Sequence, residues 1–407
     1  MSRRTAAAVG SFVAVLVALF VAQNRVQAAV ERLADAPRFE VDPMWPKPLP
    51  NHWILGNVIG VGVDSRDHVF IVHRGNASLN QRTEAGADAN PPIGECCRSA
   101  PPVLEFDPEG SLVNSWGGPG KGHDWPLSNH GISVDHKDNV WIGGNGTCDS
   151  VAVAGSLCRV AGSEDSYVLK FSHDGKLLAQ FGEPNQRRNS ASTTHFGRVA
   201  KISFDAKANE AYLADGYGNR RVAVIDMDNG KIKRFWGAYG NVPSDSNYGR
   251  NNPDAPLIPQ FRTPVHCADP TNDGLVYVCD RPNNRIQVFQ TNGKFVKEKQ
   301  IAPRTLGDGA VWDIAFSRDP QQRFIYLADG KNARVYIIDR QSLEVLTHFG
   351  SGGRQPGQFF AVHSIATDSR GNIYTTETYE GNRVQKFVFK GMAPVTKMNQ
   401  GPPWPAR

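Results

Sequence analysis

Residues 201–216 read KISFDAKANEAYLADG, which is an apolar strand, a turn containing Asp, and a second strand. The pattern recurs as GVGVDSRDHVFIVHR from Gly60, GISVDHKDNVWIGG from Gly131, CADPTNDGLVYVCDR from Cys267, DIAFSRDPQQRFIYLADG from Asp313 and SIATDSRGNIYTTET from Ser364. Third strands such as RRVAVID and NRIQVFQ follow most copies, and many units end in an aromatic-Gly segment such as RFWGA or THFGS. Short strands with turns at regular intervals are typical of propeller blades, so we expect an all-β, six-bladed β-propeller.

The unit boundaries set the number of blades. The units begin near residues 58, 128, 198, 263, 309 and 360, and a seventh blade is an alternative if residues 76–118 form one. The last unit has room for only three strands before a Pro-rich tail that begins at Gly391. We therefore expect residues 38–43 to supply the fourth strand and close the ring, which removes two exposed sheet edges.

The N-terminus has the order of a secretory signal. Arg3 and Arg4 precede an uncharged, mostly apolar run over residues 6–22, and Val26-Gln27-Ala28 offers a cleavage site after Ala28. An uncleaved membrane anchor is the alternative, because the run is just under spanning length. The expected organisation is a signal over 1–28, an N-terminal segment over 29–57 with the closing strand, a propeller over 58–390 and a tail over 391–407. The mature protein is expected to be secreted or periplasmic, with no membrane contact after cleavage.

Composition and charge exclude two classes of protein. With 40% hydrophobic and 21% charged residues among 407, the chain is too apolar to be disordered. Residues 29–407 contain 42 basic and 40 acidic residues, so nothing in the charge favours nucleic-acid binding. We expect a monomer that binds a small-molecule or peptide-derived substrate.

Six cysteines fit an oxidising compartment. The most local pairing joins Cys267 to Cys279 across a hairpin and Cys148 to Cys158 across a small-residue loop; the adjacent Cys96 and Cys97 are bonded to each other or elsewhere. Six cysteines permit 15 connectivities, so other pairings stay open. The absence of a CxxC motif argues against a thiolate zinc site.

Histidine occupies one repeat position in alternate units. Aligned on the first turn, the residues at the start of the innermost strand are Ile59, His130, Ala200, His266, Trp312 and His363. Alternate blades of a six-fold ring lie about 120° apart, so three imidazoles would converge on the central channel. Three nitrogen ligands without carboxylate or thiolate favour Zn²⁺, or copper or iron, over calcium. The alternative is that these side chains only line the channel.

Several tracts resemble the lyase domain of the peptidylglycine α-amidating enzymes, within the NHL-repeat propellers. These tracts are GVGVDSRDHVFIVHRG, SNHGISVDHKDNVWI, LADGYGNRRV, PVHCADP, VCDRPNNRIQVF and FAVHSIATD. The resemblance extends, with insertions, from Val58 to Phe389. It places the family's zinc ligands on His130, His266 and His363, its catalytic arginine on Arg74, its catalytic tyrosine on Tyr217 and a further active-site arginine on Arg281.

The resemblance implies a zinc-dependent carbon–nitrogen lyase. Such an enzyme splits an α-hydroxyglycine carbinolamide into an amide and glyoxylate. Tyr217 would be the general base, and Arg74 and Arg281 would hold the substrate carboxylate. The family's structural calcium is held by carbonyls that fall on Val61 and Ile132 and by an aspartate, but the aspartate's position is Ser364 here. Because calcium prefers carboxylate oxygens, the sequence argues against calcium at this place.

Two further readings stay open. A non-catalytic secreted NHL propeller would bind a protein or a small molecule through its rim and keep the histidines for structure. A lactonase-like hydrolase would need an axial calcium set of Glu, Asn and Asp, which the aligned position lacks. Insertions over 76–101 and 143–166 are expected to shape the substrate mouth, and a small carbinolamide is as plausible a substrate as a peptide. Asn76 and Asn145 lie in Asn-x-Ser/Thr sequons.

Overall fold

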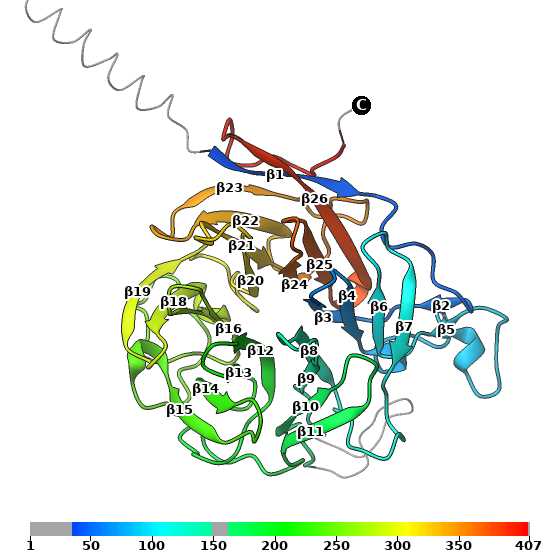
Figure 1. The fold of residues 1–407 in the computed structure, drawn as a ribbon, viewed down its shortest axis with the longest axis horizontal. Coiled ribbons are helices and arrows are strands. Elements are labelled where there is room, and N and C mark those ends of the chain that lie inside the picture. Colours follow the sequence, from blue (N-terminus) through cyan, green and yellow to red (C-terminus); the bar gives the residue numbers. More distant parts are fainter. Residues whose placement is uncertain (1–34, 149–161, 406–407) are drawn as a thin grey trace, which may run out of the picture.

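The protein is a six-bladed propeller. A computed structural model describes residues 35–148 and 162–405, and in it six four-stranded antiparallel sheets surround a central axis (Figure 1). The all-β, six-bladed architecture expected from the repeats is confirmed. The alternative of a seventh blade is wrong, because residues 103–106 and 112–116 form the two outer strands of the first blade.

Each blade is listed here from the axis outward. Blades one and two consist of β3 (Val58–Val63), β4 (Val69–His73), β6 (Val103–Phe106) and β7 (Leu112–Trp116), then β8 (Asn129–Val134), β9 (Val140–Gly144), β10 (Tyr167–Phe171) and β11 (Leu177–Gly182). Blades three and four consist of β12 (Val199–Asp205), β13 (Glu210–Asp215), β14 (Arg221–Asp226) and β15 (Ile232–Trp236), then β16 (Val265–Pro270), β17 (Leu275–Asp280), β18 (Arg285–Gln290) and β19 (Phe295–Gln300). Blades five and six consist of β20 (Asp313–Phe316), β21 (Phe324–Asp329), β22 (Arg334–Asp339) and β23 (Val345–Phe349), then β24 (Val362–Thr367), β25 (Ile373–Glu377), β26 (Arg383–Pro394) and β1 (Asp35–Asp42).

The N-terminal strand closes the ring, as predicted. β1 pairs antiparallel with β26, so the first described strand of the chain is the outermost strand of the last blade (Figure 1). Phe39 packs against Phe349 and edge-on against Tyr326, both in blade five, with ring centroids 5.6 and 5.3 Å away. The closing strand therefore completes the hydrogen bonding of blade six and adds apolar contact between blades five and six.

A recurring aspartate explains the turn between the two innermost strands in blades one, two and six. Asp64, Asp135 and Asp368 each accept hydrogen bonds at one carboxylate oxygen from the backbone N–H groups two and four residues later, at 2.8–3.0 Å. An aspartate that binds its own downstream backbone stabilises a tight turn between two strands. The repeat pattern thus reports the turn that joins the two innermost strands.

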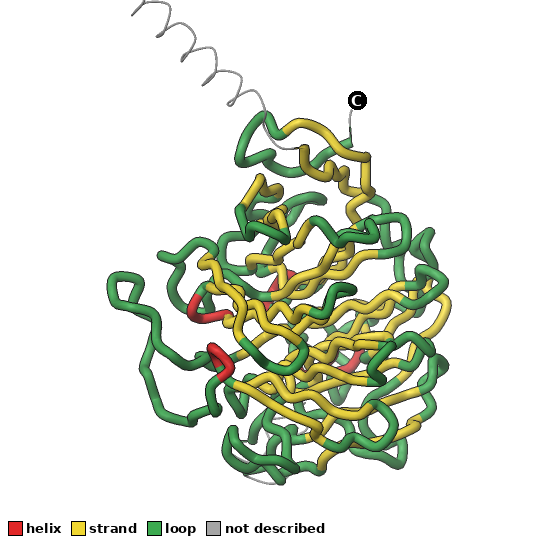
Figure 2. Tube along the Cα trace, turned by 60° about the vertical axis from the view of Figure 1, so that its left-hand side comes forward, coloured by secondary structure: helices red, strands yellow, loops and turns green. Residues whose placement is uncertain are grey.

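Loops between strands differ widely in length, and within residues 35–148 and 162–405 the helices are short 3₁₀ turns (Figure 2). The 3₁₀ helices are η1 (Gly75–Ala77), η2 (Gly86–Asp88), η3 (Ala238–Gly240), η4 (Arg281–Asn283) and η5 (Tyr379–Gly381). The 76–101 insertion includes β5 (Arg98–Ser99), which pairs in parallel with β2 (Trp53–Ile54). The 143–166 insertion joins β9 to β10, and its residues 149–161 lie outside the described part of the chain.

Two complete disulfide bonds lie within the described residues. Cys267 and Cys279 are directly opposite in β16 and β17 and are bonded, as predicted, and Cys96 is bonded to Cys97. Cys148 is disulfide-bonded, while Cys158 lies outside the described residues. These bonds are consistent with an oxidising compartment. The signal predicted over 1–28 is also outside the described residues, within which no helix has the length and apolarity to cross a membrane.

Candidate functional site

Three histidines meet at the centre of the propeller. His130, His266 and His363 are the second residues of the innermost strands β8, β16 and β24, and each is at most 3% exposed. Their ring centroids lie 4.9–5.1 Å apart, and one nitrogen of each lies within 4.8 Å of the others. The structure therefore brings together the residues selected by the repeat register, and we call this set the histidine ring.

The blades between the histidines fix the orientation of each imidazole. Every Nδ1 lies 2.5–2.8 Å from the main-chain carbonyl at the equivalent position of the next blade. The pairs are His130 with Ala200, His266 with Trp312, and His363 with Ile59. Because a carbonyl only accepts, each Nδ1 carries the proton and each Nε2 presents a lone pair. All six repeat positions thus contribute, alternately as imidazole and as acceptor.

The surroundings keep the ring uncharged. Burial, with Arg74 and Arg281 nearby, lowers the pKa of His130 to about 3. Burial also lowers the pKa of His266 and His363 well below the usual value, and the neighbouring arginine and histidine groups act in the same direction. The histidines are therefore neutral at physiological pH, which is the state that binds metals.

The hydroxyl group of Tyr217 faces the Nε2 acceptors of the histidine ring. The Tyr217 hydroxyl lies 3.1 Å from Nε2 of His130 and 3.2 Å from Nε2 of His266. Its one proton satisfies only one of these nitrogens at a time. Three convergent imidazole lone pairs with too few donors fit a cation, and neutral nitrogen ligands suit a transition metal rather than calcium. The ring can hold a metal ion, with Nδ1–H···O=C bonds as its supporting second layer.

The other predicted site residues surround the ring. Arg281 donates from Nη1 to the Tyr217 hydroxyl over 3.2 Å, and its guanidinium lies over the Trp312 ring at 4.8 Å. Arg74 donates from Nη2 to Oδ1 of Asn145 over 2.9 Å, and burial lowers its pKa. The Nε groups of both arginines are buried and have no hydrogen-bond partner among the described residues. Both guanidinium groups thus retain unused donors beside the ring.

Asn145 and Tyr379 also lie near the histidine ring, although the sequence analysis did not select them as site residues. Arg74, Asn145, Tyr217, Arg281 and Tyr379 all lie one or two residues after the second strand of their blades. Asn145 was noted only as a sequon, and Tyr379 was not singled out. The signal that identifies both is the register: the loop after the second strand faces the axis in successive blades. Asp308 from another loop joins them, because it lies 3.4 Å from the Tyr379 hydroxyl and 3.8 Å from Arg281.

A charged group also lies on innermost strands, on β12, β16 and β20. Nζ of Lys201 in β12 lies 2.9 Å from Asp269 in β16 and 2.6 Å from Asp313 in β20. Burial opposes the lysine charge, but the two carboxylates outweigh it and raise the pKa of Lys201. We call these three residues the lysine cluster.

The lysine cluster argues against a calcium ion at the position that the family resemblance implies. Ser364 replaces the aspartate of the resembled calcium site, and its hydroxyl lies 3.4 Å from the carbonyl of Ile59. The adjacent Ile365 amide donates to Asp313, whose carboxylate also binds the ammonium of Lys201. A carboxylate that already faces a lysine does not suit calcium, so the carbonyls of Val61 and Ile132 lack the charged oxygen that this ion prefers.

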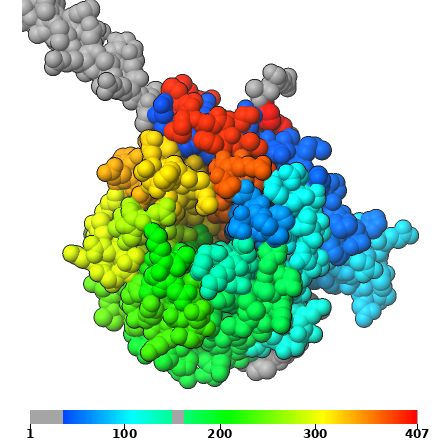
Figure 3. All heavy atoms as spheres, in the orientation of Figure 1, coloured from blue at the N-terminus to red at the C-terminus, as the bar shows by residue number. Residues whose placement is uncertain are grey.

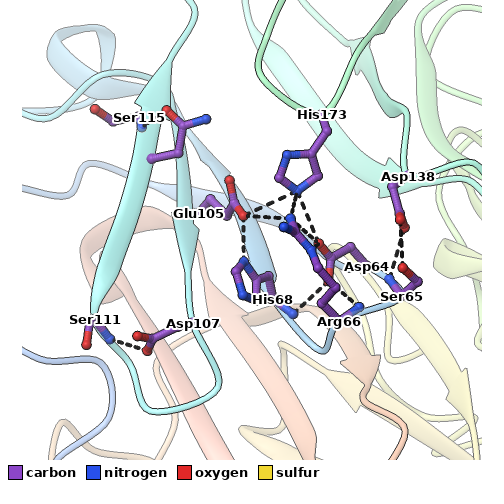
Figure 4. Close-up of polar contacts among 11 residues, drawn as sticks. Asp64, Ser65, Arg66, His68, Glu105, Asp107, Ser111, Ser115, Asp138 and His173 are labelled. Atoms are coloured by element: carbon purple, nitrogen blue, oxygen red, sulfur yellow. Dashed lines mark hydrogen bonds and ion pairs between the residues drawn. The ribbon is translucent and has the colours of Figure 1, made fainter.

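A third polar cluster joins blade one to blade two (Figure 4). Oδ2 of Asp64 and Oε1 of Glu105 lie 3.1 and 3.3 Å from Nε2 of His173, and these three residues have ligand atoms close enough for a metal. The Arg66 guanidinium lies among all three and contacts each of them. His68 also binds Glu105, at 2.6 Å. Because these groups already satisfy one another, the cluster is an inter-blade ion network.

Comparisons with known proteins agree with the sequence resemblance. The model of the NHL repeat matches residues 271–289, in blade four. Peptidyl-alpha-hydroxyglycine alpha-amidating lyase 1 of Drosophila melanogaster is 25% identical over 372 residues, which cover 86% of this chain and 59% of that protein. Peptidyl-glycine alpha-amidating monooxygenase B of Xenopus laevis is 24% identical over 346 residues, covering 82% of this chain and 34% of that protein. NHL repeat-containing protein 3 of Mus musculus is 24% identical, covering 86% of this chain and 84% of that protein.

The chain is thus a six-bladed propeller that is similar to NHL-repeat proteins and to amidating lyases, and it spans about three fifths and one third of the length of the first two relatives. Among solved structures, a streptogramin B lyase has a TM-score of 0.48 at 10% identity, covering 87% of this chain and 98% of its own. Virginiamycin B lyase from Staphylococcus aureus has a TM-score of 0.44 at 13% identity, covering 88% and 90%. Likeness at this level carries no argument about function.

Proposed function

We propose that this protein is a zinc-dependent lyase that splits the carbon–nitrogen bond of an α-hydroxyglycine carbinolamide. The observation that carries the proposal is the convergence of three Nε2 lone pairs beside a hydroxyl and two arginines, in a chain similar to amidating lyases. His130, His266 and His363 would hold the zinc. When bound, the metal supplies Lewis acidity toward a substrate oxygen.

The side chains around the ring supply the remaining chemistry. The substrate hydroxyl loses its proton, a carbonyl forms at that carbon, the carbon–nitrogen bond breaks, and the nitrogen takes up a proton. Tyr217 is positioned to move the hydroxyl proton, and its hydrogen bond from Arg281 stabilises negative charge on the phenol oxygen. The free donors of Arg74 and Arg281 would hold the substrate carboxylate. The products are an amide and glyoxylate.

The setting of this activity is also part of the proposal. The predicted signal and the disulfides support export to the periplasm or the exterior, where the protein would act as a monomer free of the membrane. The substrate is a peptide-derived or smaller carbinolamide.

Glyoxylate release from α-hydroxyhippurate by zinc-loaded protein tests the proposal. We expect turnover by the wild type and by His136→Ala, which removes an exposed histidine outside the site. His130→Ala should abolish it. Tyr217→Phe should lower kcat by roughly 10²–10⁴-fold, the usual contribution of a positioned acid–base group. Zinc-loaded wild type without turnover of any carbinolamide would refute the lyase proposal.

A second candidate is a propeller that only binds a partner. The length match to NHL repeat-containing protein 3 favours it, because that relative and this chain cover each other almost completely. Protein without a bound metal and without turnover, but with intact folding, would favour this candidate.

A further inference from the structure

A large basic pocket adjoins the histidine ring. It has a volume of about 590 Å³ and lies between the segment 247–251, the start of η4 and the loop 306–308. The segment 247–251 is part of the long connection from β15 to β16. In the space-filling view the propeller is hollowed at its centre (Figure 3). The pocket is connected to that centre by Arg281, which lines it and also donates to Tyr217.

The pocket is lined by four arginines and a single acid, and we call it the arginine pocket. The arginines are Arg220, Arg250, Arg262 and Arg281, and the acid is Asp308. Of the ion pairs found in residues 35–148 and 162–405, none includes Arg220, Arg250 or Arg262. The charge of the lining therefore exceeds what its own carboxylate can balance.

The contacts of two of these arginines are with neutral oxygens. Arg262 donates from Nη1 to the carbonyl of Tyr248 over 2.9 Å and from Nε to Oδ1 of Asn283 over 2.7 Å. Arg220 donates from Nη1 to the carbonyl of Ser244 over 3.3 Å. These bonds hold the guanidinium groups in place but do not neutralise them. Burial lowers the pKa of Arg262; Arg285 and Arg220 act in the same direction, while Asp280 opposes them.

A second pocket would suit an apolar acyl group instead of an anionic one. It has a volume of about 450 Å³, and its lining includes Arg74, Trp53, Trp125 and four prolines. An apolar acyl group would be placed there, whereas an anionic one would be placed among the arginines. The pocket with four arginines lies on blades three to five and the second pocket on blades one and two, so they lead away from the histidine ring toward different blades.

We infer that the arginine pocket binds an anionic group on the acyl side of the substrate, so that the favoured carbinolamides carry two carboxylates. The inference rests on the proposed lyase function and specifies its substrate class. Guanidinium groups bind carboxylates through paired, charge-assisted hydrogen bonds, and here several are held ready around one cavity. The first carboxylate lies between Arg74 and Arg281, and the second reaches the arginines beyond Arg281.

A matched substrate pair measures the preference. N-succinyl-α-hydroxyglycine and N-butyryl-α-hydroxyglycine differ by a carboxylate in place of a methyl group. We expect kcat/KM to favour the succinyl compound by about tenfold or more, since a hydrogen-bonded charge is worth that much. Arg250→Gln, at an exposed residue of the pocket, should reduce this ratio. Arg304→Gln should not, because Arg304 is exposed and pairs with Asp254 outside the lining.

Calorimetry separates this inference from the lyase proposal. Succinamate should bind the wild type more tightly than butyramide, and Arg250→Gln should weaken succinamate alone. Arginine-dependent succinamate binding without turnover would sustain the pocket and refute the lyase. Turnover with equal kcat/KM for the two substrates, or preference for an apolar acyl group, would refute the pocket and leave the lyase standing.

Discussion

The histidine ring and the lysine cluster both lie on innermost strands of the blades and share β16, but their electrostatic arrangements are opposite. In the ring, three neutral imidazoles present lone pairs to one place, and no described lysine or arginine donates a hydrogen bond to them. In the lysine cluster, two carboxylates converge and the chain places its own ammonium between them. The comparison teaches that the propeller axis offers equivalent positions, and that the side chains there decide whether a cation comes from solution or from the chain.

The largest effect is expected from removing the ring. The triple variant His130→Ala, His266→Ala, His363→Ala should reduce bound zinc from about one ion per chain to near none, because all three neutral nitrogen ligands are lost. Lys201→Met should keep its zinc. Elemental analysis of purified, folded protein measures both. Equal metal content in the two variants would break the distinction between the two clusters.

The lysine cluster should govern stability instead. Lys201→Met leaves Asp269 and Asp313 facing each other, so we expect a loss of about 3–5 kcal/mol in the free energy of unfolding, as for a broken buried ion pair. Lys299→Met is the matched control: its pair with Glu344 is exposed and should contribute at most about 1 kcal/mol. Urea unfolding measures both variants.

Calcium sharpens the same comparison. Calcium should raise the melting temperature of Lys201→Met, where two carboxylates become available, more than that of the wild type. A wild type that calcium stabilises as strongly as the variant would contradict the assignment of Lys201 as the resident cation.

Lowering the pH should reduce the free energy of unfolding through the histidine ring, and this effect should be smaller than those of the substitutions above. The pKa of His130 falls from 6.5 to about 3 on folding, so the unfolded chain binds protons more readily. Stability from this group is complete above pH 6.5 and declines as the pH falls toward 3, by up to about 1.4 kcal/mol per pH unit. His266 and His363 act in the same direction.

The pH effect is measured as a difference between metal-free proteins. Asp165 and Asp329, with pKa values raised to about 6, oppose the histidines over this range, so the wild-type profile alone is insufficient. Between pH 7.5 and 5.5, the triple histidine variant should lose less stability than the wild type, while Lys299→Met, which removes an exposed lysine far from both clusters, should follow the wild type. Parallel profiles for all three proteins would contradict a neutral, buried ring.

Much of the fold and half of the site were readable from the sequence. The turn aspartates and strand pairs recur, so the innermost strand of each blade could be aligned, and alternate histidines in that alignment identified the ring. The closing strand followed from counting strands, because a three-stranded last blade requires a fourth. Arg74, Tyr217 and Arg281 came from resemblance, although their shared position after the second strand is also visible once the blades are aligned.

Other features depend on how separate loops meet in space. Lys201 and Asp313 share the register position directly after Ala200 and Trp312, but Asp269 lies two positions further along its strand, so the repeat alone does not bring the three together. The Nδ1–H tautomers are set by main-chain carbonyls of neighbouring blades, and residue letters carry no information about carbonyl positions. The basic pocket is built by loops whose lengths follow no period.

The sequence by itself determined the propeller architecture, the closing strand and the three histidines that face the axis, since these follow from the periodic hydrogen bonding of the sheets. Only the tertiary structure decided which charges neutralise each other and which remain free. The physical reason is distance: charge pairing is set by separations of a few ångströms between blades, and a linear repeat does not contain them.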